Sequence, residues 1–378
     1  MSTSSSSGRR IYQDIGVRTI INGRGATTAV GGTLMPPEVV AAMTGAAGAY
    51  VVLDELNVAV GRRIAEVTGA AAGCVVNGSA AGMALSAAAC IAGSDPARIR
   101  RLPDSEGLAN QIIVHRCQRI NYDLMFRLGG GQLVEIGRPL GTEPWELAAA
   151  INPRTAAVAW IDSPATTPGA TDFGAVVSTA HAHKLPVIVD AASTLPPVQH
   201  LRRWIDRGAD LVIYSGGKGI RGPQDSGLVA GRHDLIAAVG ANSNPHAGIG
   251  RGMKVSKEAM AGLWVALDLF LHTDHQAEYQ AHLRQAQTMV ARLRDRADLS
   301  CVLESDWEDW PAPIVRLFPR QGAWRPEEVR DALAAGDPSI HLNVERSGLM
   351  VSTHCLQPGE EAIVINRLAM ILDAAASA

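Results

Sequence analysis

The chain has 378 residues, of which 47% are hydrophobic and 19% charged, and its formal net charge is -3. This composition allows a large buried core, and the charge provides no overall basic field that would attract nucleic acid or an anionic membrane. The five cysteines are scattered without a C-x-x-C pair, so neither a zinc site nor a disulfide scaffold is indicated. With no signal-peptide pattern and no membrane-spanning apolar run, we expect a cytoplasmic protein.

The predicted elements alternate between helices and strands over most of the chain, after a Ser-rich tail at 1–14 that we expect to be disordered. From about 60 to 93 the pattern predicts a helix, a short strand, a turn of small residues and an Ala-rich helix. Short β-branched strands follow, with helical segments between most of them. These strands are QIIVHR (111–116), QLVEIG (132–137), AAVAWID (156–162), LPVIVDAAS (185–193) and ADLVIYS (209–215). Continuously apolar strands that alternate with helices are typical of a parallel sheet covered on both faces.

The pattern changes after about residue 255. One long helix or two abutting helices are predicted over 258–297, and the remaining segments read as three short strands and a closing helix. These segments are 314–319, 341–348, 349–355 and 360–375. We therefore expect a large domain over 15–255, whose N-terminal part is able to pack on the small domain. A connector helix and a small α+β domain would occupy 256–378.

Polar residues follow three of the predicted strands, where an open α/β sheet binds its ligands. Asp190 ends one strand, Ser215 and Lys218 follow another, and the turn NGSAAG at 77–82 opens a helix. Each has an ordinary explanation alone: a turn-capping carboxylate, a solvated lysine or a common small-residue turn. Together they offer backbone amides for a phosphate, an amine for a carbonyl and a carboxylate for a ring nitrogen. Pyridoxal 5'-phosphate (PLP) requires these three groups.

The order of NGSAAG, VDAAS (189–193) and SGGKGIRGPQ (215–224) resembles the fold-type-I PLP enzymes. In detail the chain resembles the family of bacterial selenocysteine synthase and D-glucosaminate-phosphate ammonia-lyase, through these motifs and through segments 21–39, 251–258 and 358–368. The resemblance implies an α/β fold with a mostly parallel central sheet in a large domain and a small α+β C-terminal domain. It also implies PLP as the cofactor and a homodimer or larger homo-oligomer with shared active sites.

The same resemblance implies roles for individual residues. Lys218 would form the Schiff base with PLP and serve as the acid and base at the substrate Cα, and Asp190 would pair with the ring nitrogen. The other expected cofactor-binding residues are Gly78, Ser79 and Ala80 through backbone amides, Ser215 through its hydroxyl, Gly222 in a turn with Pro223, and Gln118 over the ring, in preference to His115.

The class V aminotransferases that share this fold usually hold the substrate carboxylate with a small-domain arginine, and the corresponding strand at 348–355 has none. We expect Arg24, Arg251 and Lys254 to bind the anionic groups of the substrate, with two further arginines, at 116 and 221, behind them. Arg24 and Arg251 lie in Gly-rich loops, where backbone can approach a ligand, although surface ion pairs are the ordinary role of such residues.

These features predict a PLP-dependent lyase of the β-elimination or ammonia-lyase type in amino-acid metabolism, acting on a small polar amino acid that is hydroxylated or phosphorylated. A PLP-dependent amino-acid racemase or aldolase would use the same residues. A non-catalytic PLP-fold binding subunit is the contrasting class, although it would have no reason to keep both Lys218 and Asp190. Selenocysteine synthase activity is disfavoured because the chain lacks a basic surface and an N-terminal RNA-binding region. No metal, nucleic-acid or membrane partner is expected.

Overall fold

The computed structural model describes residues 10–163, 167–307 and 312–376 of the chain. The chain divides into two compact units. The large unit is Glu38–Thr273, and the small unit combines Met1–Pro37 with Asp274–Ala378.

The boundary between the units lies between two helices, α11 (Lys257–His272) and α12 (His275–Leu293). The sequence analysis placed the boundary at residue 255, before both helices. The buried face of α11 includes Leu263 and Ala266, and both side chains lie beside Gly222 of the large unit. This packing assigns α11 to the large unit.

A mixed, mostly parallel sheet forms the centre of the large unit. Its strands, among the described residues, are β2 (Ala72–Val76), β3 (Gln111–His115), β4 (Gln132–Ile136), β5 (Thr155–Ile161), β6 (Val187–Asp190), β7 (Leu211–Ser215) and β8 (Gly227–Gly231). They lie in the order β2-β8-β7-β6-β5-β3-β4, and only β8 runs antiparallel to its neighbours. The carboxyl ends of the other strands therefore meet at one edge. The predicted, mostly parallel sheet and the strands β2 to β7 are confirmed, whereas β8 was not predicted as a strand.

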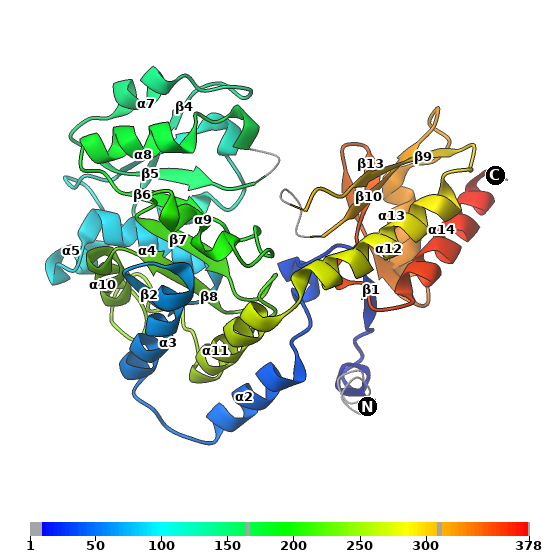
Figure 1. Ribbon diagram of the computed structural model, residues 1–378, viewed down its shortest axis with the longest axis horizontal. Coiled ribbons are helices and arrows are strands. Elements are labelled where there is room, and N and C mark those ends of the chain that lie inside the picture. Colours follow the sequence, from blue (N-terminus) through cyan, green and yellow to red (C-terminus); the bar gives the residue numbers. More distant parts are fainter. Residues whose placement is uncertain (1–9, 164–166, 308–311, 377–378) are drawn as a thin grey trace. The chain divides into compact units, whose positions relative to one another are not determined.

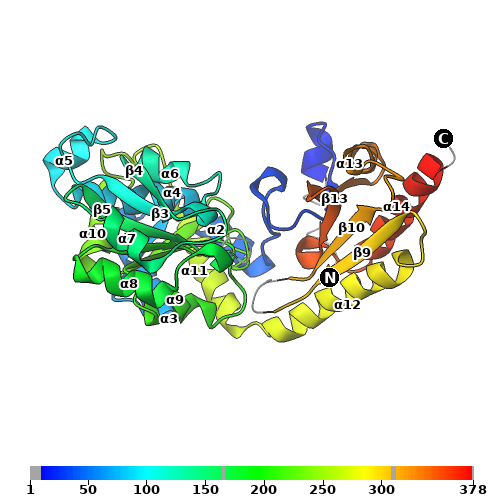
Figure 2. The ribbon, with the colours of Figure 1, turned by 90° about the horizontal axis from the view of Figure 1, so that it is seen from above.

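Helices cover both faces of this sheet, with α4 and α6 on one side and α8 and α9 on the other (Figure 2). The helices on the α4 side are α4 (Gly78–Ala92), α5 (Pro96–Arg101), α6 (Leu124–Leu128) and α10 (His233–Asn242). Those on the α9 side are α3 (Leu53–Thr68), α7 (Pro144–Ala150), α8 (Phe173–Ala182) and α9 (His200–Asp206). A further helix, α2 (Pro37–Ala47), packs with α11 through Met43.

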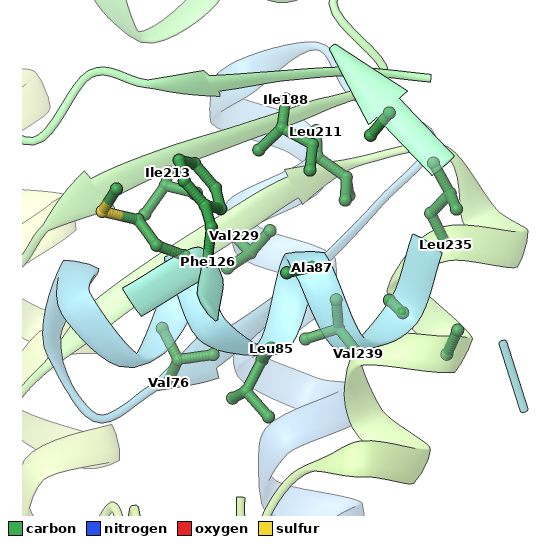
Figure 3. Close-up of a cluster of buried hydrophobic side chains, with 14 of the residues drawn as sticks. Val76, Leu85, Ala87, Phe126, Ile188, Leu211, Ile213, Val229, Leu235 and Val239 are labelled. Atoms are coloured by element: carbon green, nitrogen blue, oxygen red, sulfur yellow. The ribbon is translucent and has the colours of Figure 1, made fainter. Parts of the chain in front are cut away.

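Helix α4 is the central helix of the large unit. Nearly all of its residues from Ala81 to Ala92 are buried, and the many alanines allow it to lie close to the sheet. Its side chains join those of α6, α10 and six strands in one hydrophobic cluster (Figure 3). Because α4 is fixed by this core, its N-terminus is held at the carboxyl edge of the sheet.

The small unit contains a second sheet and three of the later helices (Figure 1). The sheet is antiparallel, in the order β12 (Asn343–Glu345), β13 (Gly348–Ser352), β10 (Ile314–Pro319) and β9 (Leu299–Glu304). The helices are α12, α13 (Pro326–Ala335) and α14 (Glu360–Ala376). Of these elements, β10, β12, β13 and α14 were predicted from the sequence, whereas β9 and α13 were not.

The N-terminal segment belongs to the small unit because β1 (Ile20–Asn22) pairs in parallel with β11 (Ser339–His341). Residues 10–14, which we expected to be disordered with the tail, are helical, and the helix ends near Gly16, whose φ is 76°. The tail at 1–9 lies outside the described residues. Single 3₁₀ turns occur at η1 (Thr28–Val30), η2 (Arg116–Gln118), η3 (Thr167–Gly169) and η4 (Thr353–Cys355). In the described part of the chain, no helix has the length and apolarity needed to cross a membrane.

Candidate active site

Lys218 lies in the loop that joins β7 to the antiparallel strand β8. The loop is closed by its own backbone: Gly216 N donates to Ser226 O at 2.9 Å, and Gly222 N donates to Gly216 O at 2.8 Å. Ser226, which is fully buried, also donates its hydroxyl to Pro223 O at 2.6 Å. The position of Lys218 is thus fixed by a compact hydrogen-bonded loop.

The glycines beside Lys218 are required by close contacts with neighbouring backbone. A Cβ at Gly217 would lie 2.4 Å from Gln224 Cα, and a Cβ at Gly219 would lie 2.1 Å from Leu195 O. Real Cβ atoms do not approach other atoms so closely, so neither position accepts a side chain without a backbone shift. Lys218 therefore lies between two positions that must be glycine.

The amine of Lys218 interacts with two residues at the end of β6, Ser193 and Asp190. Its Nζ donates a hydrogen bond to Ser193 Oγ at 2.7 Å. Burial of the half-buried side chain lowers the pKa of Lys218, and the charge of Asp190 opposes this shift. The amine is consequently easier to deprotonate than that of a solvated lysine, which suits a nucleophile or a base.

Asp190 is the last residue of β6 and is only 6% exposed. Burial raises the pKa of this carboxyl group, whereas a hydrogen bond from Ala192 N, at 3.1 Å, and the charge of Lys218 lower it. The carboxylate thus lacks full compensation by the described residues, and a cationic group bound beside it would stabilise its charge. The structure brings together the two predicted catalytic residues, Lys218 and Asp190.

The N-terminus of α4 offers its backbone amides to a ligand. Gly78, Ser79 and Ala80 are its first residues, and among the described groups the Asn77 side chain makes no capping hydrogen bond. That side chain donates instead to Lys254 O at 2.5 Å. Free amides at the start of a long helix are suited to a phosphate group.

Gly227, which the sequence analysis did not identify, lies directly beneath this turn. A Cβ on Gly227 would lie 2.6 Å from Gly78 C and 2.9 Å from Ser79 N. Gly227 also pairs with Ser215 across β7 and β8, so it brings the predicted hydroxyl next to the predicted amides. The sequence does show a glycine at the start of the apolar run 227–231. Its contact with Gly78 and Ser79, however, depends on how the strands pair, which the sequence pattern does not give. Ser193 was also missed, although it ends the motif VDAAS.

Both residues considered for the ring face, Gln118 and His115, are fully buried. Gln118 Oε1 accepts a hydrogen bond from Ile161 N at 3.2 Å, and its Nε2 has no partner among the described residues. His115 packs edge-on against Trp160, with 5.5 Å between ring centroids, and burial lowers the pKa of His115 to about 4. His115 is thus a neutral core histidine, whereas Gln118 is fixed to the carboxyl end of β5 and retains a free donor.

Arg251 and Lys254 are exposed, and neither has an ion-pair partner in the described parts of the chain. The backbone of Lys254 lies at the start of α4 because its carbonyl accepts the hydrogen bond from Asn77. These two cations therefore belong to the large unit, and Lys254 lies beside the predicted phosphate site.

The other predicted residues are placed differently. Arg24 lies in the small unit, where its Nε donates to Asn343 Oδ1 at 2.8 Å. Arg116 forms an ion pair with Glu135 at 3.4 Å. Gly222 is buried against α11, where its Cβ would lie 3.2 Å from Ala266 Cβ.

Comparison with known proteins identifies the family of the chain. The family model described as L-seryl-tRNA selenium transferase matches residues 20–309. The chain is 35% identical over 375 residues to a 5'-C-glycyluridine monooxygenase-decarboxylase from Streptomyces sp., with 96% of this chain and 92% of that protein covered. It is 33% identical over 378 residues to the D-glucosaminate-6-phosphate ammonia lyase of Salmonella typhimurium (strain 14028s / SGSC 2262), with 97% of this chain and 99% of that protein covered.

Solved structures lead to the same conclusion. A structure of D-glucosaminate-6-phosphate ammonia-lyase aligns with a TM-score of 0.82 at 32% identity, and covers 97% of this chain and 99% of that chain. More distant PLP-bound enzymes, at 13–14% identity and a TM-score of 0.63, share the fold. The predicted fold class, PLP dependence and enzyme class are confirmed. The chain belongs to the L-seryl-tRNA selenium transferase family of fold-type-I PLP enzymes, as its motifs at 77–82, 189–193 and 215–224 had indicated.

Proposed function

We propose that this protein is a PLP-dependent lyase that releases ammonia from an α-amino acid with a hydroxylated or phosphorylated carbon chain. The observation that carries this proposal is the half-buried amine of Lys218 beside the buried carboxylate of Asp190, at the carboxyl edge of the sheet. A relative 33% identical over nearly its whole length bears the name of an ammonia lyase.

The residues at this edge fit PLP. The amides of Gly78, Ser79 and Ala80, with the hydroxyl of Ser215, would hold its phosphate, because the helix end is uncapped and its close contact with Gly227 brings it next to Ser215. Lys218 would bind the aldehyde carbon. Asp190 would hold a proton on the ring nitrogen, whose positive charge would compensate the buried carboxylate.

Gln118 would contact the ring through its free amide nitrogen, and Gly222 would shape the turn that reaches the phosphate of a neighbouring subunit. PLP, when bound, supplies an electron sink for the electrons that remain when a bond at the substrate Cα breaks. The chain's own residues must then move the protons.

Lys218 is the residue placed to move these protons. Its lowered pKa gives a larger share of neutral amine, and Ser193 Oγ holds that amine in one position. The neutral amine would take the proton from Cα, and the resulting ammonium would donate it to a β-hydroxyl group that leaves as water. Hydrolysis of the dehydrated product then yields ammonia and a keto acid.

The two relatives suggest the substrate class. Glucosaminate 6-phosphate is an amino acid derived from a sugar, and glycyluridine joins an amino-acid group to a nucleoside. We therefore propose an α-amino acid on a polyhydroxylated skeleton as the substrate. The free cations Arg251 and Lys254 would bind its anionic groups.

Oxidative decarboxylation is a second candidate reaction, because the relative named monooxygenase-decarboxylase is 35% identical over nearly the whole chain. That reaction would break the bond from Cα to the carboxylate and would consume dioxygen. It differs from ammonia loss in its products, so one assay distinguishes them.

We also propose a cytoplasmic homodimer whose interface includes the exposed apolar residues near α2 and α11. Tyr50 is 101% exposed, Val51 and Val52 follow it in sequence, and Trp264 on α11 is 50% exposed. Apolar groups in such a run are stabilised when a second copy covers them. The loop at Gly222 lies against the same helix, α11.

The reaction is tested with a panel of D- and L-β-hydroxy amino acids and sugar-derived amino acids, with and without a terminal phosphate. We expect equimolar ammonia and keto acid from a sugar-derived member, and none with Lys218→Ala. Carbon dioxide with dioxygen uptake would favour the second candidate. Racemisation without ammonia, or aldol cleavage, would refute the lyase. A protein that remains colourless with added PLP would indicate a binding subunit.

Asp190→Asn is expected to change apoprotein stability and activity in opposite directions. The folded-state pKa of Asp190 is raised, so the folded protein is stabilised when this carboxyl group is protonated. This stabilisation is complete below the unfolded-state pKa and is lost as the pH rises through the folded-state pKa. Without PLP, the variant should therefore melt higher than wild type near neutral pH, by about 2 °C, because it lacks the buried charge. Near about pH 3 this difference should disappear. With PLP, activity should fall about 100-fold. A variant less stable than wild type at neutral pH would contradict this account.

Arg251→Gln and Lys254→Gln are expected to raise KM about 10-fold or more, with a small change in kcat, because the lost charge binds the substrate and its transition state alike. Arg100→Gln, on the exposed side of α5, is the matched control and should leave both constants unchanged. Steady-state kinetics on the active member of the panel provides the measurement. An unchanged KM in both site variants would remove these residues from the substrate site.

A further inference from the structure

A second carboxylate, Asp162, lies next to Asp190 at the carboxyl edge of the sheet. It follows the last residue of β5, Ile161, which pairs with Asp190 in register. The backbone N of Asp162 donates to Asp190 O at 2.9 Å. Two acidic residues therefore lie at the carboxyl ends of two neighbouring strands, one residue apart in register.

The two carboxyl groups leave the sheet on opposite faces, because side chains alternate along a strand. Asp190 shares a face with Ile188, which packs in the cluster with α4. Asp162 shares a face with Trp160, which packs against aromatic rings of α8 and α9. Because the two strands are adjacent, a charge on one carboxyl group acts on the other across the carboxyl end of the sheet, where Asp190 is buried and Asp162 is half-buried.

Trp204 holds Asp162 in place. Its Nε1 donates to Asp162 Oδ2 at 2.8 Å, and the Trp204 side chain is 1% exposed. The ring packs against Phe173 at 4.6 Å and Trp160 at 6.0 Å between centroids. The guanidinium of Arg207 lies 4.9 Å from the ring centroid. The carboxylate is therefore fixed by a rigid aromatic cluster.

The charged and titratable groups that face Asp162 come from several elements. Burial raises its pKa, while the Trp204 hydrogen bond and then three cationic or basic residues of the α9 region lower it: Arg203, His200 and Arg207. On β7, the pKa of the buried Tyr214 is raised by burial and further by Asp162. On β6, the charge of Asp162 adds to the increase at Asp190, while Lys218 opposes it.

We propose that Asp162 is a positioning residue, a negative charge anchored by Trp204 that favours retention of a proton at Asp190 and on the ring nitrogen bound there. This inference rests on the proposed function, since it assigns Asp190 to that nitrogen. It adds a second carboxylate to the site, and its effect passes through Asp190 without contact between Asp162 and the substrate. If Asp162 served only as the acceptor for Trp204, its removal would change stability and leave Asp190 unaffected.

The first test follows the titration of Asp190 in the full chain without PLP, by carboxyl carbon NMR after labelling with 13C-aspartate. Asp190→Asn identifies the signal. Asp162→Asn should move the apparent midpoint of Asp190 to lower pH by about half a unit or more, because a neighbouring negative charge is lost. Trp204→Phe should move the Asp190 midpoint in the same direction by a smaller amount. Without the hydrogen bond from Trp204 the pKa of Asp162 rises, so Asp162 carries less negative charge.

Asp206→Asn is the matched control, since it removes a charge from the exposed side of α9, where Asp206 Oδ2 lies 3.8 Å from Arg202 Nε. It should leave the midpoint unchanged. An Asp190 midpoint equal to wild type in folded Asp162→Asn would overturn the proposal. If that variant fails to fold, an unchanged midpoint in Trp204→Phe would do so.

The second test uses the protein loaded with 15N-labelled PLP, in which the nitrogen shift reports protonation of the ring. Asp162→Asn should lower the protonated fraction at pH values where the wild type is partly deprotonated, and Asp206→Asn should not. Neither test involves turnover. Failure of the proposed reaction therefore leaves this inference testable, and failure of the inference leaves the proposed reaction intact.

Discussion

Burial of an amine and a carboxylate at the same edge of a parallel sheet shifts both Lys218 and Asp190 away from their charged states. Desolvation lowers the pKa of Lys218 and raises that of Asp190, and their mutual attraction only partly opposes these shifts. Such a pair costs stability in the absence of a ligand. A cofactor with an aldehyde and a basic ring nitrogen would relieve both costs, so the site is better stabilised when filled.

Small residues make this burial possible. Gly217 and Gly219 allow the β7–β8 loop to lie close to neighbouring backbone, and Gly227 allows the start of α4 to lie against β8. The alanines of α4 hold that helix close to the sheet. Together these positions place a helix N-terminus, an amine and a carboxylate at one edge of the central sheet of the large unit.

Sequence reasoning succeeded where chemistry is local to a motif. The strands ending at Asp190 and Ser215 are continuous apolar runs, and the exits of such strands in an α/β sheet share one edge, so the pair with Lys218 could be predicted. Gly227 and Asp162 could not, because their importance arises from contacts across strands: Gly227 under Gly78, and Asp162 beside Asp190. The place of α11 depends similarly on packing rather than on its helical pattern.

The central claim is that the nitrogen of Lys218 forms the covalent link to PLP. Borohydride reduction of the PLP-loaded protein, followed by peptide mapping with mass spectrometry, tests it most directly. The account predicts a pyridoxyl group on the peptide that contains Lys218, and its loss in Lys218→Ala. A pyridoxyl group on another lysine, such as Lys254, or none on any peptide, would contradict it.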